Sequence, residues 1–180
     1  MKSTTDSSGN SLIELALILP LLCVVVFGII DFSRALYDAE VMENLVGEGS
    51  SMASRGTSPA LTASTVVNNA GKDISLGTLG CVIVTQVTEE SSPQVTAQSQ
   101  AGACGVGVIS KVGCLQGHVG CGNQNSNNPA TLPASAVTLL SNESNGSSLY
   151  VTEIFYSYGT ITPISLANLL PSQLYSAAYY

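Results

Sequence analysis

The cysteines in the second half of the chain are the residues best suited to chemistry. Cys114, His118 and Cys121 form the pattern C-x3-H-x2-C, and Cys104 could supply a fourth ligand to zinc. The pattern lacks the C-x2-C that opens a zinc knuckle. If this part of the chain is exported to an oxidising compartment, the four cysteines at positions 81, 104, 114 and 121 form two disulfides, with three possible pairings. We therefore predict two disulfides among Cys81, Cys104, Cys114 and Cys121 and no metal, with a zinc-dependent module as the alternative.

No group of residues in the sequence resembles a catalytic centre. His118 is the sole histidine, and the pattern G-x-S-x-G is absent. The glycine-rich run at 102–107 matches neither a P-loop nor a dinucleotide-binding fingerprint. Glu89 and Glu90 precede Ser-Ser-Pro and fit a solvated turn better than an acid–base pair. The sequence therefore predicts a protein that is not an enzyme and that uses no cofactor.

One carboxylate lies at the start of a long apolar run, where a plain anchor does not need it. Residues 15–30 carry no charge, and the stretch 12–32 covers roughly 31 Å at about 1.5 Å per helical residue, enough to cross a bilayer core. Glu14 lies in the first turn of this stretch. An ionisable group near the apolar layer is unfavourable, so it indicates a function. Glu14 is also the fifth residue after Gly9.

This order of residues resembles the start of type IV prepilins, in which a glycine precedes the cleavage point and a glutamate is fifth in the mature chain. Residues 14–37, with Pro20 and the Phe-Gly-Ile-Ile-Asp-Phe segment at 27–32, more closely resemble the TadE-like pseudopilins of the Tad (Flp) pilus system. The resemblance covers about residues 9–55. It implies cleavage between Gly9 and Asn10 and a part for Glu14 and Pro20 in assembly.

The same resemblance implies a structural role and a location. A prepilin peptidase would process the chain, which would then join or initiate a Tad or type IV-like pilus as a minor pilin or pseudopilin. Its partners would be that peptidase, other pilin subunits, the assembly machinery and the lipid bilayer. The chain would cross the bacterial inner membrane once with its N-terminus inside, and its C-terminal domain would be exported to the pilus or cell surface.

Two other functions remain open on the sequence. A membrane-tethered extracellular adhesin or binding module would keep Met1, and a type II secretion pseudopilin would share the cleavage point and the glutamate. Nucleic-acid binding is excluded, because the net charge is −7 and the five Lys and Arg residues form no cluster. A secretory signal is disfavoured, because Lys2 is opposed by Asp6 and no A-x-A pattern follows the apolar run.

Periodicity predicts that the helix continues beyond the membrane. Apolar and small residues recur at steps of three and four on one face, from Phe32 through Leu36, Ala39, Met42, Val46 and Gly49 to Ala53. The sequence Gly-Thr-Ser-Pro at 56–59 ends the helix. We therefore divide the chain into a leader (1–9), a transmembrane segment (10–32), an extramembrane continuation of the helix (33–56) and an exported α+β domain (57–180).

The exported domain should combine short helices with an antiparallel sheet. We expect a helix at 60–75 capped by Ser58, because an N-cap serine accepts a hydrogen bond from the first turn. Strands are expected at 81–88, 94–100, 105–112 and 149–161, followed by an irregular tail with one short helix. The predicted fold class is therefore α+β: a long N-terminal helix with a transmembrane and an amphipathic half, followed by a small disulfide-bonded domain.

Overall fold

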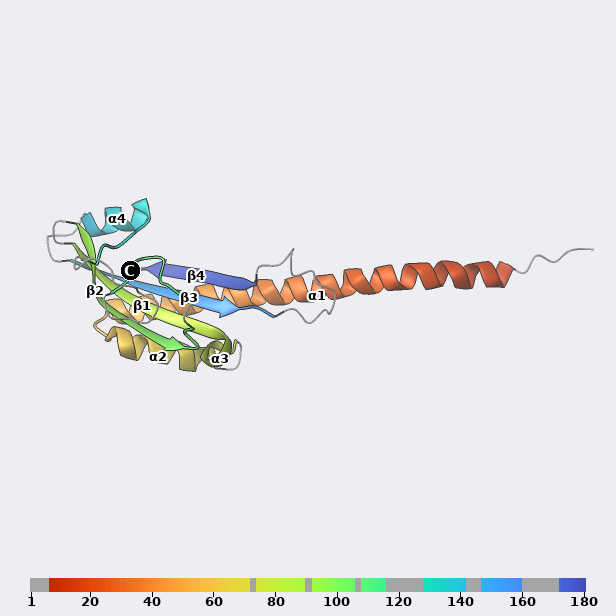
Figure 1. Ribbon diagram of the computed structural model, residues 1–180, viewed down its shortest axis with the longest axis horizontal. Helices are drawn as coiled ribbons and strands as arrows, with labels where there is room; N and C mark the ends of the chain where they lie inside the picture. Colours follow the sequence, from red (N-terminus) through yellow and green to blue (C-terminus); the bar gives the residue numbers. More distant parts are fainter. Residues whose placement is uncertain are drawn as a thin grey trace, which may run out of the picture.

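One long helix and one antiparallel sheet make up the computed structural model of this chain (Figure 1). The structure describes residues 7–71, 74–89, 92–105, 108–115, 128–141, 147–159 and 172–180, with side chains from residue 12 onwards. Helix α1 (Ser7–Ser54) is continuous, and only its C-terminal half packs on the domain. The predicted α+β class, with a long N-terminal helix before a small disulfide-bonded domain, is confirmed.

The sheet has the strand order β2-β1-β3-β4, and all neighbouring strands are antiparallel. Its strands are β1 (Gly80–Glu89), β2 (Pro93–Gly102), β3 (Ser148–Ser157) and β4 (Gln173–Tyr179). Strands β1 and β3 are central and mostly buried, because both of their faces are covered. The edges of the sheet are therefore β2 and β4.

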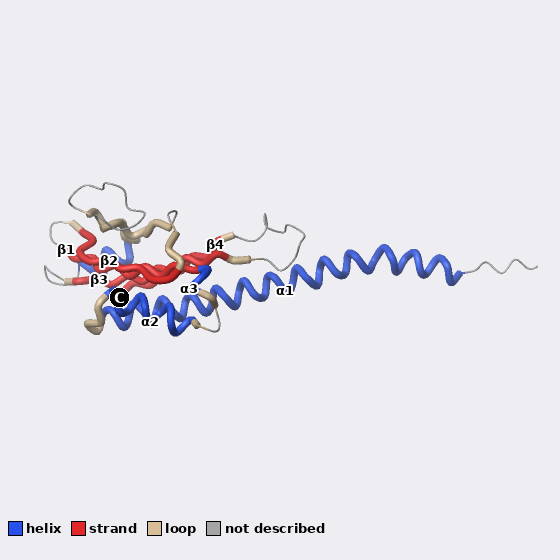
Figure 2. The backbone as a smooth tube through the Cα atoms, turned by 60° about the horizontal axis from the view of Figure 1, so that its bottom comes forward, coloured by secondary structure: helices blue, strands red, loops and turns tan. Residues whose placement is uncertain are grey.

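Two helices cover one face of this sheet (Figure 2). Helix α1 lies against β3 and β4, and α2 (Pro59–Ala70) lies against β1 and β2. The predicted cap is confirmed, because Ser58 Oγ accepts a hydrogen bond from Leu61 N at 3.4 Å. Gly56 follows α1 with φ of +95°, a conformation that glycine adopts without strain. The short α3 (Leu76–Leu79) leads into β1. Helix α4 (Ala134–Ser141) packs on the opposite face of the sheet, where Ala136 and Leu140 join a buried cluster with Leu149.

The main core lies between the sheet and these two helices. Met42 and Val46 of α1, Val66 of α2 and Val84 and Ile154 of the central strands are almost fully buried. Burying each side chain of this size contributes roughly 1.5–3 kcal/mol relative to leaving it in water. The extramembrane part of α1 is therefore an integral part of the domain core.

Several features of this domain differ from the expectations. Residues 105 and 108–112 form a loop in place of a strand, and the Glu153 carboxylate accepts a hydrogen bond from the backbone of this loop at Lys111 N. The segment 173–179, expected to be irregular with one short helix, is β4, because Leu174 and Ala178 pack toward the helices while Tyr175 packs on the other face. Helix α4 was not predicted, and the second helix ends at Ala70 and not at residue 75.

Candidate assembly helix and its junction with the domain

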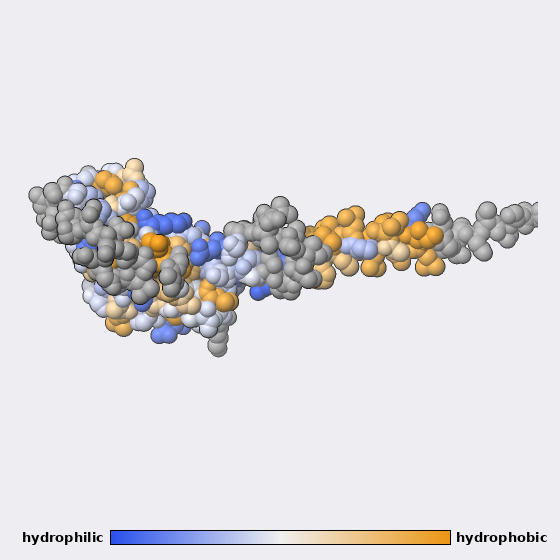
Figure 3. Space-filling model, in the orientation of Figure 1, coloured by the Kyte–Doolittle hydropathy of each residue, from blue (hydrophilic) through white to orange (hydrophobic). Residues whose placement is uncertain are grey.

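The N-terminal half of α1 presents large apolar side chains to its surroundings on all sides (Figure 3). Leu12 and Leu17, for example, are 68% and 73% exposed. Such a surface is unfavourable in water and favourable in a hydrocarbon layer. The helix is long and apolar enough to cross a membrane, which suggests that it anchors the chain by a single pass.

The predicted processing residues, Gly9 and Asn10, and the predicted assembly residues, Glu14 and Pro20, all belong to this half of the helix. Helix α1 already begins at Ser7, so the backbone of Gly9 and Asn10 is helical. Glu14 is exposed, and Pro20 lies inside the helix without ending it. Residues four apart in a helix share one face, so Asn10 and Glu14 are neighbours along α1.

The buried stripe of α1 starts one position earlier than the sequence predicts. Phe32 and Leu36 are exposed to 55% and 56%, whereas Asp31, Ala35 and Asp38 are buried. From Met42 onwards the predicted positions are buried, at residues 42, 46, 49 and 53. The membrane-proximal part of the stripe was placed wrongly because its buried residues include two aspartates, which pattern analysis expects to face water.

Polar contacts join α1 to β3 and to Tyr158, which directly follows β3. They lie at the C-terminal end of the apolar half of α1. The Tyr158 hydroxyl donates a buried hydrogen bond of 2.7 Å to the main-chain oxygen of Asp31. About two helical turns further on, burial raises the pKa of Asp38, and the charge of Arg34 opposes that rise. Burial, and then the charge of Asp38, raise the pKa of Tyr156. The domain therefore begins directly at the end of the exposed apolar half, with α1 continuous across the junction.

A second contact joins α1 to the sheet between β3 and β4. Ser50 is fully buried, and its Oγ accepts a hydrogen bond from Thr152 N at 3.1 Å and donates one to Ala178 O at 2.9 Å. Gly49, beside it, lets the helix approach closely, because a Cβ there would lie 2.9 Å from Val66 Cγ2. Small residues thus bring the helix backbone near the sheet and insert a hydroxyl between two strands.

The opposite face of the sheet carries a buried carboxylate. Glu153 of β3 has no exposed surface, and it accepts hydrogen bonds from Lys111 N at 2.9 Å, from the Tyr175 hydroxyl at 3.0 Å and from the Ser110 hydroxyl. The Lys111 ammonium lies 3.5 Å from the centre of the Tyr175 ring. Burial is the main cause that raises the pKa of Glu153, and its hydrogen bonds oppose that rise. Glu153 therefore holds the loop at 108–112 on the sheet. The free-energy cost of burying its carboxyl group depends on pH.

Replacing Glu153 with glutamine should change how stability depends on pH. A carboxyl whose pKa is raised by folding stabilises the fold when protonated, and this stability is lost as pH rises through the folded pKa. As pH falls from neutral toward 4.5, the wild type should therefore gain stability relative to E153Q. The measurement is the urea midpoint of both proteins across this range, and parallel pH profiles would contradict the assignment.

The matching control for the hydrogen bonds of this group is Glu153→Ala. It leaves three donors without their acceptor, and each unsatisfied buried group costs about 1–3 kcal/mol. E153A should therefore be less stable than E153Q at every pH. Equal stability of the two variants would show that the carboxylate does not hold the loop.

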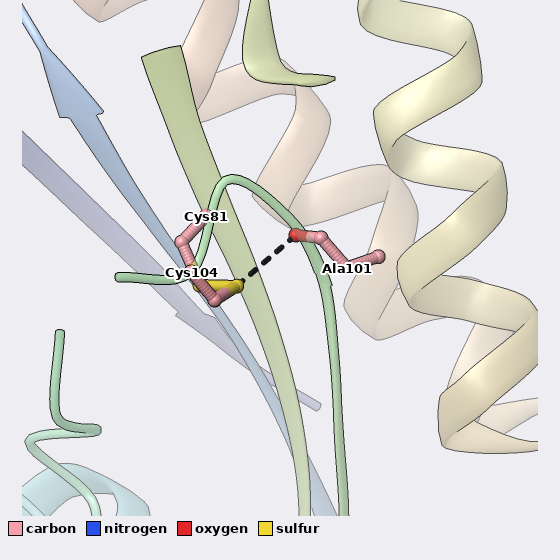
Figure 4. Close-up of a disulfide and its surroundings, with 3 residues drawn as sticks. All are labelled: Cys81, Ala101 and Cys104. Carbon is pink, nitrogen blue, oxygen red and sulfur yellow. Dashed lines mark hydrogen bonds between the residues drawn. A yellow bond between two sulfur atoms is a disulfide. The ribbon is translucent and has the colours of Figure 1, made fainter. Parts of the chain in front are cut away.

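One disulfide joins the start of β1 to the residues that follow β2 (Figure 4). Cys81 and Cys104 have Cα atoms 4.7 Å apart, and Cys104 Sγ lies 3.4 Å from the Ala101 oxygen. Cys114 is also disulfide-bonded, but Cys121 and His118 lie outside the described residues, so a second bond between Cys114 and Cys121 stays a prediction. Among the described residues, no group of His, Cys, Asp and Glu could hold a metal ion.

Comparison with models of protein families shows which family the N-terminal helix resembles. The model of the family described as TadE-like protein matches residues 9–50. The N-terminal segment is TadE-like. The predicted resemblance is thereby confirmed, and it suggests a Tad pilus-related protein. No curated protein and no solved structure matches the chain.

The TadE-like match spans two physically different parts of α1. It includes the exposed apolar half with Glu14 and Pro20, and it continues along the buried stripe as far as Ser50. The matched segment therefore includes both the apolar half, which suggests an anchor, and residues that pack into the domain. Sequence analysis did not predict that Asp31, Ser50 and Glu153 are buried. Only for Glu153 did the sequence contain a signal, which is a charged residue in the middle of an apolar strand.

Proposed function

We propose that this chain is a structural subunit, a minor pilin or pseudopilin, that is cleaved after Gly9 and then joins or initiates a Tad or type IV-like pilus. Its role is to pack through α1 and to present the α+β domain, and it performs no catalysis. The chain crosses the bacterial inner membrane once, with its N-terminus on the cytoplasmic side and the domain on the exported side. The observation that carries the proposal is the TadE-like match over residues 9–50.

The form of α1 supports this proposal. A pilus subunit needs a helix that is stable in lipid alone and that can later pack against neighbouring helices. The exposed apolar half of α1 meets the first need, and its exposed face at Phe32 and Leu36 offers a surface for the second. The buried contacts of Ser50 and of Tyr158 hold the domain rigidly on the helix, so both move together when the helix changes its surroundings.

The mature N-terminus tests the processing step. Mass spectrometry of protein extracted from membranes should find a chain that begins at Asn10. Replacing Gly9 with a bulky residue such as leucine should abolish cleavage, and the full-length chain should still insert, because insertion depends on residues 15–30. A matched control is Ser8→Leu, which changes the residue before the glycine and keeps the glycine itself.

The other outcomes separate the alternative functions. An intact Met1 in cells that hold an active prepilin peptidase would favour a membrane-tethered adhesin or binding module. A chain that begins after the apolar run would show a secretory signal. Cleavage after Gly9 followed by retention in a secretion complex, and not in pili, would favour a type II secretion pseudopilin.

A further inference from the structure

Strand β4 lies at one edge of the sheet, and no other strand in the described part of the chain pairs with its outer side. Tyr150 and Tyr180 exchange both of their backbone hydrogen bonds, at 2.6 and 2.9 Å, and Ala178 is paired with Thr152 in the same register. In an antiparallel pair, every second residue bonds the neighbouring strand. The even-numbered residues of β4 therefore bond β3, and the N–H and C=O groups of the odd-numbered residues, at 173, 175, 177 and 179, point away from the sheet.

The two edges of the sheet differ in how they are protected. At β2, the chain itself adds a further bridge, with Val95 N donating to Asn128 O at 2.9 Å and Ala130 N donating to Pro93 O at 3.0 Å. The β1–β2 pair also contains a register irregularity. Strand β4 has a regular register and contains no proline and no charged side chain. Charges, prolines and bulges are the usual devices that stop an edge from pairing with another chain, and β4 carries none of them.

We propose that β4 is an interaction surface on which the β4 strand of a second copy of this chain adds to the sheet. An extended strand is the partner that matches a row of alternating N–H and C=O groups. The net charge of −7 makes two copies repel one another, and β4 is a stretch without charged side chains along which they can meet. Because β2 is partly covered, pairing through β4 ends at two copies.

Anchoring in a membrane favours this pairing and sets its direction. Two chains held in one bilayer have a high effective concentration, so a short row of hydrogen bonds is sufficient. Strand β4 runs in the same direction as α1, away from the apolar half (Figure 1). Two copies with the same orientation in one membrane therefore bring their β4 strands together in parallel. The inference rests on anchoring in one membrane and not on cleavage or on entry into a pilus.

Parallel pairing also fixes the register. In a parallel ladder, a residue bonds the residues before and after the one that lies level with it. The outward groups belong to odd-numbered residues in both copies, so an odd residue of one copy must lie level with an even residue of the other. The copies are then offset by an odd number of residues, and the smallest such offset, one residue or about 3.3 Å, keeps most of the ladder paired. A pocket of about 610 Å³ at the end of β4, lined by Leu139, Leu149, Tyr179 and Tyr180 among others, can accept a side chain of the second copy.

The first experiment measures pairing of the full-length chain in liposomes. Cys23, a free cysteine, is labelled with a small apolar donor or acceptor fluorophore, and energy transfer is measured at low surface density. The wild type should show transfer above the level expected for random mixing. Ala177→Pro removes one outward N–H and should reduce the transfer to that level, whereas Ala177→Val keeps the N–H and should not. Proline is tolerated on an edge strand where its nitrogen faces solvent, so A177P should melt like the wild type.

The second experiment tests the register. In a Cys23→Ala chain, copies with Ser176→Cys are co-expressed with tagged copies carrying Ala177→Cys, and disulfide-linked dimers are counted on non-reducing gels. The mixed pair should crosslink several-fold more than either variant alone, because only residues of opposite parity lie level. Random transfer in the wild type, transfer by a folded A177P equal to that of the wild type, or equal crosslinking of all pairs would overturn the proposal.

Discussion

Leucine in place of Gly49 should strongly destabilise the domain, whereas leucine in place of Gly47 should leave its stability almost unchanged. A Cβ at position 49 would lie 2.9 Å from Val66 Cγ2 and 3.0 Å from Thr152 Cγ2, and both of these side chains are almost fully buried. A Cβ at position 47 meets nothing within 4 Å. The larger leucine must therefore push α1 away from the sheet at the first position only.

The two glycines are matched controls for each other because both lie inside α1. Leucine gains helix propensity over glycine equally at both, so the difference between the variants reports the contact alone. Overpacking of a dense core costs typically 1–3 kcal/mol, and displacement of the neighbouring Ser50 bonds adds to it, so we expect a difference of about 3 kcal/mol. The measurement is the urea midpoint from near-ultraviolet tyrosine dichroism in detergent. Equal midpoints would show that the close approach at Gly49 does not support the domain.

The parts of the structure that local pattern determines were predictable. The uncharged run at 15–30 predicts an exposed apolar helix, and the recurrence of small and apolar residues places Met42, Val46, Gly49 and Ala53 on its buried face. Strands β1 and β3 were predictable because both are rich in β-branched and aromatic residues. The cap at Ser58 was predictable because it depends only on a residue three positions away.

The parts that depend on contacts between distant residues were not predictable. Ser50 and Ala178 are separated by 128 positions, and Asp31 and Tyr158 by 127. Pattern analysis expects an aspartate to face water, so it cannot anticipate a buried one whose partners come from the far end of the chain. Strand β4 is weakly patterned and half-exposed, and it is a strand because β3 and α1 lie beside it.

These contacts also explain how one helix can serve two environments. Removing the apolar half of α1 from lipid exposes only side chains that the domain does not use, because the buried stripe starts at Asp31. The domain should therefore stay folded if the apolar half leaves the membrane, as the proposed assembly requires. In that passage the carboxylate at position 14 would need a new partner.

Glu14→Leu should insert in the membrane as well as the wild type and yet be absent from pili. The proposed cleavage after Gly9 would create an α-amino group on Asn10, and the helical backbone over residues 7–14 places this residue one turn from Glu14 on the same face of α1. The amine of the same or of a neighbouring subunit can donate a charge-assisted hydrogen bond to the carboxylate, and such bonds strengthen where water is excluded. Adjacent helices would satisfy both charges at one axial offset only, so on this hypothesis the pair sets the register of assembly.

The measurement is the distribution of each variant between sheared pili and membranes. Glu14→Gln keeps the shape of the side chain and removes its charge, so it should fail as Glu14→Leu does, whereas Glu14→Asp keeps the charge on a shorter stem and should be incorporated in part. The mature N-terminus of every variant is determined by mass spectrometry, because an uncleaved chain has no amine at Asn10 and would be excluded for that reason alone. Normal incorporation of a cleaved Glu14→Leu chain would rule out the charge pair, since a subunit that lacks the carboxylate would then have found its register through the apolar faces of α1.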